Sequence, residues 1–198
     1  MRSCVGSQKV ASIRTPIAQH SPRVLRLEAI GAVGMILLGS AMHFAFELLG
    51  NWTPMALVAA VNESIWEHLK LAFWPGLLWA FVTPLPTNLS RWDVLSAKGI
   101  SLAATAALIV AVFATYTAIL GRNLLVLDIG TFVFAICAGQ LISALLLTSG
   151  SRLHRLVPIL GTVLLALQVV AYSHFTFFPP DHWLFVETQT GLRGIPGR

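Results

Sequence analysis

The sequence predicts an all-α integral membrane protein, a helical bundle of about five transmembrane helices. Hydrophobic residues make up 56% of the chain and charged residues only 11%, whereas about a quarter of a soluble domain is charged. Several apolar runs reach the roughly 20 residues that a helix needs to cross the hydrocarbon core. Because lipid offers no partner for an open backbone hydrogen bond, these runs must be helices.

Five runs have this length: Leu27–Leu49, Ile65–Leu85, Ala97–Leu120, Leu124–Thr148 and Leu156–Phe178. No Ser-, Gly- or Pro-rich linker separates them, so residues 26–180 are expected to form a single transmembrane domain. A basic cytoplasmic tail, 1–25, precedes it, and a short extracytoplasmic tail, 181–198, follows. The segment Asn51–Val61 is too short to span and too apolar for a solvated loop, which predicts an interfacial or re-entrant piece resting against the bundle.

The basic residues predict how the bundle is oriented. The formal net charge is +5, and Lys and Arg lie mainly at the ends of the apolar runs: in the N-terminal tail, at Arg91 and Lys98, and at Arg152 and Arg155. The positive-inside rule places these segments in the cytoplasm, with the N-terminus inside and the C-terminus outside. The positive charge therefore does not indicate a nucleic-acid partner. The expected partner is the lipid bilayer.

Polar side chains gather at the predicted outer ends of three helices. His43 and Glu47 end the first run, a polar cluster opens the second, and His174 ends the fifth, with Asp181 just beyond. The cluster at the second run comprises Asn62, Glu63, Glu67, His68 and Lys70. Ionisable groups at membrane depth are costly unless they pair, line a cavity or bind something, so this cluster is the candidate functional site.

Imidazole and carboxylate groups from separate helices suit a divalent metal such as zinc, which would activate water at an open coordination position. One hypothesis is a site with His43, Glu67 and His174 as ligands. Its catalytic residues would be Glu67 together with Glu63 or Asp181, either of the last two acting as base or supporting the ligands.

A purely structural interpretation of the same residues is also available. Ser64 and Glu67 have the spacing of a capping box, in which each side chain bonds the other residue's backbone N–H. Lys70, three residues on, would neutralise Glu67. His43 would be a buried histidine hydrogen-bonded across helices, and His174 part of an aromatic belt at the membrane interface.

The stretch from His43 to Pro75 resembles an uncharacterised bacterial family of small polytopic membrane proteins, catalogued as a domain of unknown function. The resemblance rests on HFAFE at 43–47, NESIWEHLKL at 62–71 and the closing FPP at 178–180. It implies a bacterial inner-membrane location, and it implies that the start of the second helix and the Pro-Pro tail form one outward-facing unit. The resemblance supplies no activity.

Three functions fit these observations. The first is an accessory or partner-binding membrane subunit whose polar cluster joins helices or engages a membrane partner or a second copy. The second is a membrane-embedded, metal-dependent hydrolase-like enzyme acting on a lipid-like substrate. The third is a small transporter with a proton or ion relay through Glu63, Glu67, Lys70 and His43. The sequence contains no nucleotide-binding glycine loop, HExxH or GxSxG motif.

Overall fold

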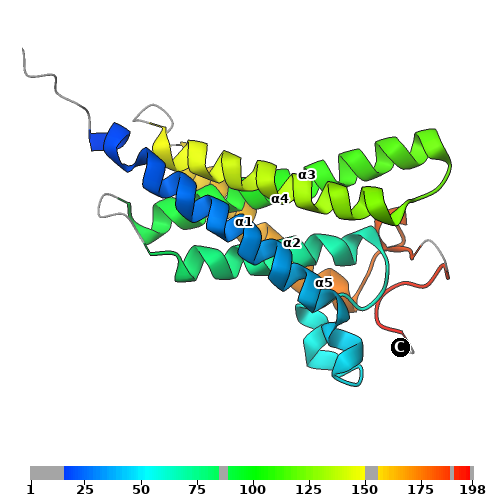
Figure 1. Ribbon diagram of the computed structural model, residues 1–198. Coiled ribbons are helices and arrows are strands. Elements are labelled where there is room, and N and C mark those ends of the chain that lie inside the picture. The colour runs from blue at the N-terminus through cyan, green and yellow to red at the C-terminus, as the bar shows by residue number, and fades with distance from the viewer. Residues whose placement is uncertain (1–15, 85–88, 150–155, 188–189, 197–198) are drawn as a thin grey trace, which may run out of the picture.

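The computed structural model describes residues 16–84, 89–149, 156–187 and 190–196, which form five α-helices and two short 3₁₀ helices. The elements are α1 (Pro16–Leu48), η1 (Thr53–Leu57), α2 (Ile65–Val82), α3 (Arg91–Leu120), α4 (Leu125–Thr148), α5 (Leu156–Phe177) and η2 (Trp183–Phe185). Figure 1 shows the helices as an elongated bundle, with η1 and the C-terminal tail near the end where α1 and α5 finish.

The five expected helices are confirmed, and two of them begin earlier than the apolar runs. α3 starts at Arg91 because a capping box precedes the apolar run: the Ser90 N–H donates to Asp93 Oδ2 over 2.8 Å, and the Asp93 N–H donates to Ser90 Oγ over 3.2 Å. α1 starts at Pro16, inside the segment expected to be a tail. Residues 1–15 of that tail lie outside the described part of the chain.

Four of these helices are long and apolar enough to cross a membrane: α1 from Pro22 onward, α3, α4, and α5 from Val157 onward. α2 differs from the expectation. It has 18 residues, about 27 Å of helix, carries Glu67, His68 and Lys70 in its first turns, and is not among the four candidate spans. It packs against α1 and α3.

The polarity of the bundle is that of a membrane protein. Large apolar side chains are exposed on the outer surface of α5, as at Ile159, Leu167 and Val170. Several charged side chains are buried, among them Glu28, Lys70 and Lys98. The outer surface therefore suits contact with lipid, and the buried charges require partners inside the bundle.

Small residues let α3 and α5 approach until their backbones touch. A Cβ atom placed on Gly99 would lie 1.9 Å from the carbonyl oxygen of Gly161. A Cβ atom on Gly161 would lie 2.0 Å from the carbonyl oxygen of Ser96. Close packing through small residues is a main source of helix association in lipid, because no hydrophobic effect operates between helices there.

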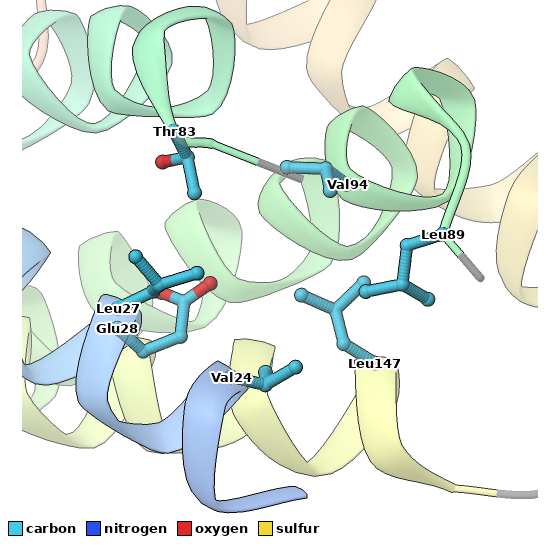
Figure 2. A pocket seen from close by; sticks show the side chains of 7 residues that line it. All are labelled: Val24, Leu27, Glu28, Thr83, Leu89, Val94 and Leu147. Carbon is cyan, nitrogen blue, oxygen red and sulfur yellow. The ribbon is translucent and has the colours of Figure 1, made fainter. Parts of the chain in front are cut away.

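A buried polar network joins α1, α3 and α4. Lys98 Nζ lies 2.5 Å from Glu28 Oε2 and 2.5 Å from Gln140 Oε1, and Ser143 Oγ donates to Glu28 Oε1 over 2.9 Å. Glu28 also lines a small pocket with Val24, Leu27, Thr83, Leu89, Val94 and Leu147 (Figure 2). Lys98, expected as an orientation signal in a cytoplasmic loop, is instead buried inside α3.

The contact between α3 and α5 is testable by adding one methyl group. Gly161→Ala forces the two backbones apart, and overpacking of this kind costs about 1–3 kcal/mol. The midpoint of thermal unfolding in detergent should fall. Gly34→Ala on α1 is the matched control, because no neighbouring atom lies within 4 Å of the added carbon. Equal midpoints for the two variants would contradict the close approach.

Candidate metal centre

The site is built at the start of α2. The Ser64 N–H donates to Asn62 Oδ1 over 2.9 Å, and Asn62 Nδ2 donates to the carbonyl oxygen of Gly194 over 2.9 Å. Asn62 thus joins the first turn of α2 to the C-terminal tail. Because Glu63 lies between two residues fixed in this way, its backbone is held where the helix begins.

The expected capping box between Ser64 and Glu67 is wrong. Ser64 is the N-cap residue, but its side chain makes no capping hydrogen bond. Glu67 Oε2 instead accepts a hydrogen bond over 3.1 Å from the N–H of Val61, a residue that precedes the helix. The carboxylate is drawn inward because a buried lysine, one turn along α2, provides a stronger partner.

That lysine is Lys70, whose Nζ lies 2.6 Å from Glu67 Oε2. Lys70 also donates to the carbonyl oxygen of Ala56 over 2.8 Å and to Thr176 Oγ1 over 3.1 Å. The expected neutralisation of Glu67 by Lys70 is therefore confirmed. Ala56 is fully buried, so the segment 51–61 does rest against the bundle, fastened between α2 and α5.

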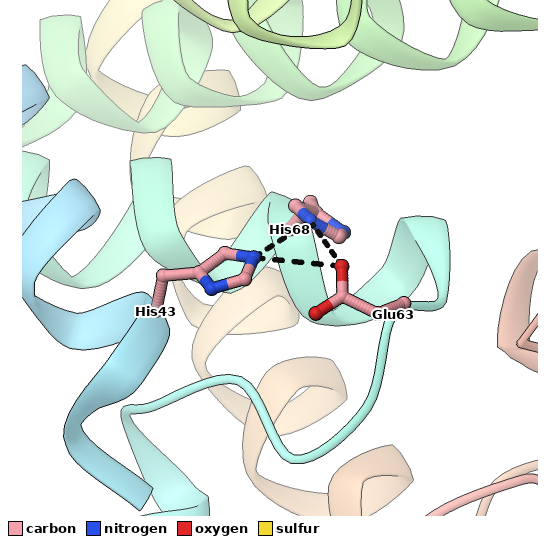
Figure 3. A group of neighbouring side chains, drawn as sticks. All are labelled: His43, Glu63 and His68. Atoms are coloured by element: carbon pink, nitrogen blue, oxygen red, sulfur yellow. Dashed lines mark hydrogen bonds and ion pairs between the residues drawn. The ribbon is translucent and has the colours of Figure 1, made fainter. Parts of the chain in front are cut away.

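Next to this buried pair, three partly exposed side chains converge on one point. His43 comes from α1, Glu63 from the loop before α2, and His68 from the first turns of α2 (Figure 3). The two imidazole Nε2 atoms are 3.2 Å apart. Glu63 Oε2 lies 3.5 Å from His43 Nε2 and 3.5 Å from His68 Nε2.

These separations suit a tetrahedral metal ion. A triangle with sides of 3.2, 3.5 and 3.5 Å has a circumscribed radius of about 2.0 Å. A point near its centre, slightly out of the plane, therefore lies about 2.0–2.2 Å from all three atoms, which is the length of zinc bonds to histidine nitrogen and carboxylate oxygen. Two tetrahedral ligands at such distances are themselves about 3.3 Å apart.

The imidazole of His68 is oriented for this role. Its Nδ1 atom lies 2.8 Å from the carbonyl oxygen of Ser64, which is an acceptor. A proton on Nδ1 satisfies that bond and leaves the lone pair of Nε2 facing His43 and Glu63. Metal-binding histidines are commonly fixed in this way by a hydrogen bond from the other ring nitrogen.

Glu63 is held in its charged form. When protons occupy both imidazole Nε2 atoms, hydrogen bonds from His43 and then from His68 place the pKa of its carboxyl well below the usual range, although partial burial acts in the opposite direction. A bound metal would take the place of those protons. The carboxylate is therefore ionised at neutral pH and supplies the negative charge that a divalent cation requires.

The structure brings together only part of the expected ligand set. His43, Glu63 and His68 meet, whereas Glu67 is committed to Lys70. His174 is exposed, and its ring stacks on Phe178 with the centroids 5.2 Å apart. Among the described residues, His43, Glu63 and His68 form the group whose ligand atoms lie close enough together to share a metal ion, and neither Glu67 nor His174 belongs to it.

The other expected residues lie around this group. Asp181 pairs with Arg193 on the surface, with Oδ1 and NH1 2.6 Å apart, and so belongs to the tail. Glu47 is exposed on α1, one turn beyond His43. Asn62 binds the tail, as described above.

Helical spacing alone does not predict which side chains meet at this site. It groups Glu63, Glu67 and Lys70 on one face of α2 and turns His68 away, but Glu63 precedes the helix and follows loop geometry instead. The Asn62 turn folds Glu63 back over the first turn of α2, next to His68. The sequence does show that Glu63 and His68 lie on either side of the start of a helix, and this could have placed them together.

These features define a helical integral membrane protein with a His/Glu group at one end of its bundle. The chain belongs to a family of unknown function, DUF6512, whose model matches residues 19–195. This confirms the resemblance to a family of uncharacterised function. No curated protein and no solved structure is significantly similar to the chain.

The buried pair beneath the site predicts an asymmetric mutational response. Lys70→Met leaves the Glu67 carboxylate buried without a cation, and breaking a buried pair in this way costs about 3–5 kcal/mol. The double variant Glu67→Gln/Lys70→Met removes both charges and should recover most of the stability. Unfolding of the two variants and the wild type in detergent measures the coupling.

Arg193→Ala is the control, because its partner Asp181 is on the surface and exposed ion pairs contribute little. The assignment fails if the double variant is no more stable than Lys70→Met.

Proposed function

We propose that His43, Glu63 and His68 bind a divalent metal, zinc first, and that the protein is a membrane-embedded, metal-dependent hydrolase-like enzyme. The single observation that carries this proposal is the triangle of ligand atoms, whose dimensions fit a tetrahedral ion. Two histidines and one glutamate form a known catalytic zinc set, and three protein ligands leave the fourth position for water. When bound, the ion would lower the pKa of that water to about 7 and so supply a nucleophile.

Exposure separates this group from the polar residues that join helices. Two buried ion pairs belong to polar contacts that join helices: Lys98 of α3 pairs with Glu28 of α1, and Lys70 of α2, paired with Glu67, also donates to Thr176 of α5. Glu63, by contrast, has a side chain that is 50% exposed. A carboxylate so open to solvent contributes little as an interhelical link. This supports the enzyme over the accessory subunit.

The surroundings of the group favour a lipid-like substrate. Phe44, which follows His43, is 60% exposed, and Leu48 is 80% exposed on the last turn of α1. Trp52, in the next loop, is 60% exposed. A polar, metal-binding group beside exposed apolar side chains suits an amphiphile, whose head reaches the metal while its chain lies on the apolar rim.

The transport relay has less support. Two of its four residues, Glu67 and Lys70, are almost fully buried and neutralise each other at 2.6 Å. A relay needs groups that exchange protons or ions with water. Only His43 and Glu63 of that set have partly exposed side chains.

Elemental analysis of the purified protein tests the metal centre directly. The wild type should contain about one zinc per chain, as expected for one three-ligand site. His43→Ala, His68→Ala and Glu63→Gln should each weaken binding by more than the roughly 10- to 100-fold that loss of a supporting outer partner costs.

His174→Ala is the matched control and should retain the metal, because this histidine stacks on Phe178 outside the group. Wild-type protein that folds normally but binds no divalent metal would overturn the proposal. The accessory-subunit function would then be the better supported of the three.

Substrate class is tested with zinc-loaded protein in mixed micelles. Esters or phosphodiesters with long acyl chains should be hydrolysed faster than short-chain analogues, because the chain contacts the apolar rim. Phe44→Ser should reduce the preference for long chains while zinc content stays unchanged. Leu167→Ser on α5, a residue of equal exposure to Phe44, is the control.

If the protein binds zinc but hydrolyses none of these substrates, the proposed metal centre stands and the proposed hydrolase activity is wrong.

A further inference from the structure

We propose that Asn62 is a positioning residue, which ties the C-terminal tail to the proposed metal ligand Glu63 and so holds that ligand in place. The inference rests on the proposed metal centre, whose three ligand atoms must keep their separations. Two of the ligands, His43 and His68, lie in helices, whereas Glu63 lies in a loop. The side chain of Glu63 is 50% exposed, and its described polar contacts are those with the two histidines. Its position therefore depends on how the loop is fixed.

The side chain of Asn62 closes a turn around Glu63. Its Oδ1 atom accepts the Ser64 N–H over 2.9 Å, so the backbone of Glu63 lies inside a ring that a hydrogen bond closes. Asparagine favours such turns because its short side chain reaches the backbone two residues on. The ring limits the backbone conformations of Glu63 and determines where its side chain starts.

The other end of the same amide is bound to the tail, which lies beside the start of α2 (Figure 1). Asn62 Nδ2 donates to the carbonyl oxygen of Gly194 over 2.9 Å. An amide that accepts at one end and donates at the other has one orientation, because turning it over would set donor against donor and acceptor against acceptor. The turn around Glu63 therefore depends on the position of Gly194.

Gly194 is held in place from both sides. Before it, the Glu187 N–H donates to the carbonyl oxygen of Leu192 over 2.9 Å, which folds the tail back on itself. After it, Ile195 packs against a cluster of buried apolar residues from α1 and the segment that follows α1. The cluster consists of Phe46, Ala56, Ala59 and Val61. The carbonyl oxygen that Asn62 binds therefore belongs to an anchored part of the tail.

The backbone of Gly194 allows this contact to be changed without altering any residue near Glu63 in the sequence. Gly194 has a φ of +65°, a conformation that favours glycine. A Cβ atom added there would also lie 3.1 Å from Cγ of Pro179. A larger residue at this position would strain the turn and displace the carbonyl oxygen from Asn62.

The zinc affinity of the full-length protein tests the proposal. Gly194→Val should weaken zinc binding by about 10-fold, the smaller end of the effect of losing an outer partner. Asn62→Ser should have the same effect, because its hydroxyl can still accept the Ser64 N–H but does not reach the tail. Gly121→Val is the matched control and should keep the wild-type affinity. Gly121 also has a positive φ, +68°, but it caps α3 and no atom lies within 4 Å of an added carbon.

The two substitutions act on one hydrogen bond, so their effects should not add. The double variant Asn62→Ser/Gly194→Val should bind zinc about as tightly as the weaker of the two single variants. A tail that only stabilised the fold would lower the midpoint of thermal unfolding without this pattern. Unchanged zinc affinity in either single variant, or losses that add in the double variant, would overturn the proposal.

Hydrogen exchange of the metal-free protein separates this proposal from the metal centre itself. The Ser64 N–H should exchange about 2- to 10-fold faster in Gly194→Val than in the wild type, which is the effect of losing roughly one hydrogen bond. In Gly121→Val it should exchange at the wild-type rate. If the wild type binds no zinc but exchange is accelerated in this way, the metal centre is wrong and the positioning of Glu63 by the tail stands. An unchanged exchange rate in Gly194→Val overturns the positioning role, whether or not zinc binds.

Discussion

The site depends on the buried ion pair between Glu67 and Lys70. In surroundings that exclude water, neither charge is stable without the other, so the pair fixes every group that completes its hydrogen bonds. Those groups are the carbonyl of Ala56, the N–H of Val61 and the hydroxyl of Thr176. One ion pair therefore fastens the segment after α1 and the end of α5 to the start of α2, next to which the His–Glu group is assembled.

The NESIWEHLK stretch works as one unit because its alternate sides face different environments. Toward the interior, Trp66 packs on Tyr172 and Phe185, with ring centroids 4.9 and 4.6 Å apart, beside the Glu67–Lys70 pair. Toward the surface, Glu63 and His68 face His43. The inward residues give the first turn of α2 a fixed position, and the outward residues use that position to converge on one point. A metal centre needs this rigidity, because its ligands must be held close to their final geometry.

The bundle carries its charge in two kinds of place, and these have different physical roles. The Glu28 and Glu67 ion pairs are buried near opposite ends of the bundle, where they hold helices together without a hydrophobic effect to help them. The His–Glu group is partly exposed, and its side chains contact each other, while hydrogen bonds of His68 and Asn62 with the start of α2 help to position them. Interhelical linkage and candidate chemistry are thus carried out by different residues, although the sequence places Glu63, Glu67, His68 and Lys70 within a single helix turn or two.

The sequence by itself determined the all-helical bundle and most helix bounds, though not the starts of α1 and α3, because apolar length in lipid leaves the backbone no other closed hydrogen-bonding pattern. It also identified the family, and it predicted an ionisable cluster that contains His43, Glu63 and His68, because ionisable groups at membrane depth need partners. Only the tertiary structure decided that His68, rather than Glu67 and His174, meets His43 and Glu63. Which residues meet depends on the direction in which the loop at Asn62 turns and on which lysine pairs with each carboxylate. Helical periodicity does not predict either of these. The Glu28–Lys98 pair was missed for the same reason, because its members are 70 residues apart and meet only when α1 and α3 pack.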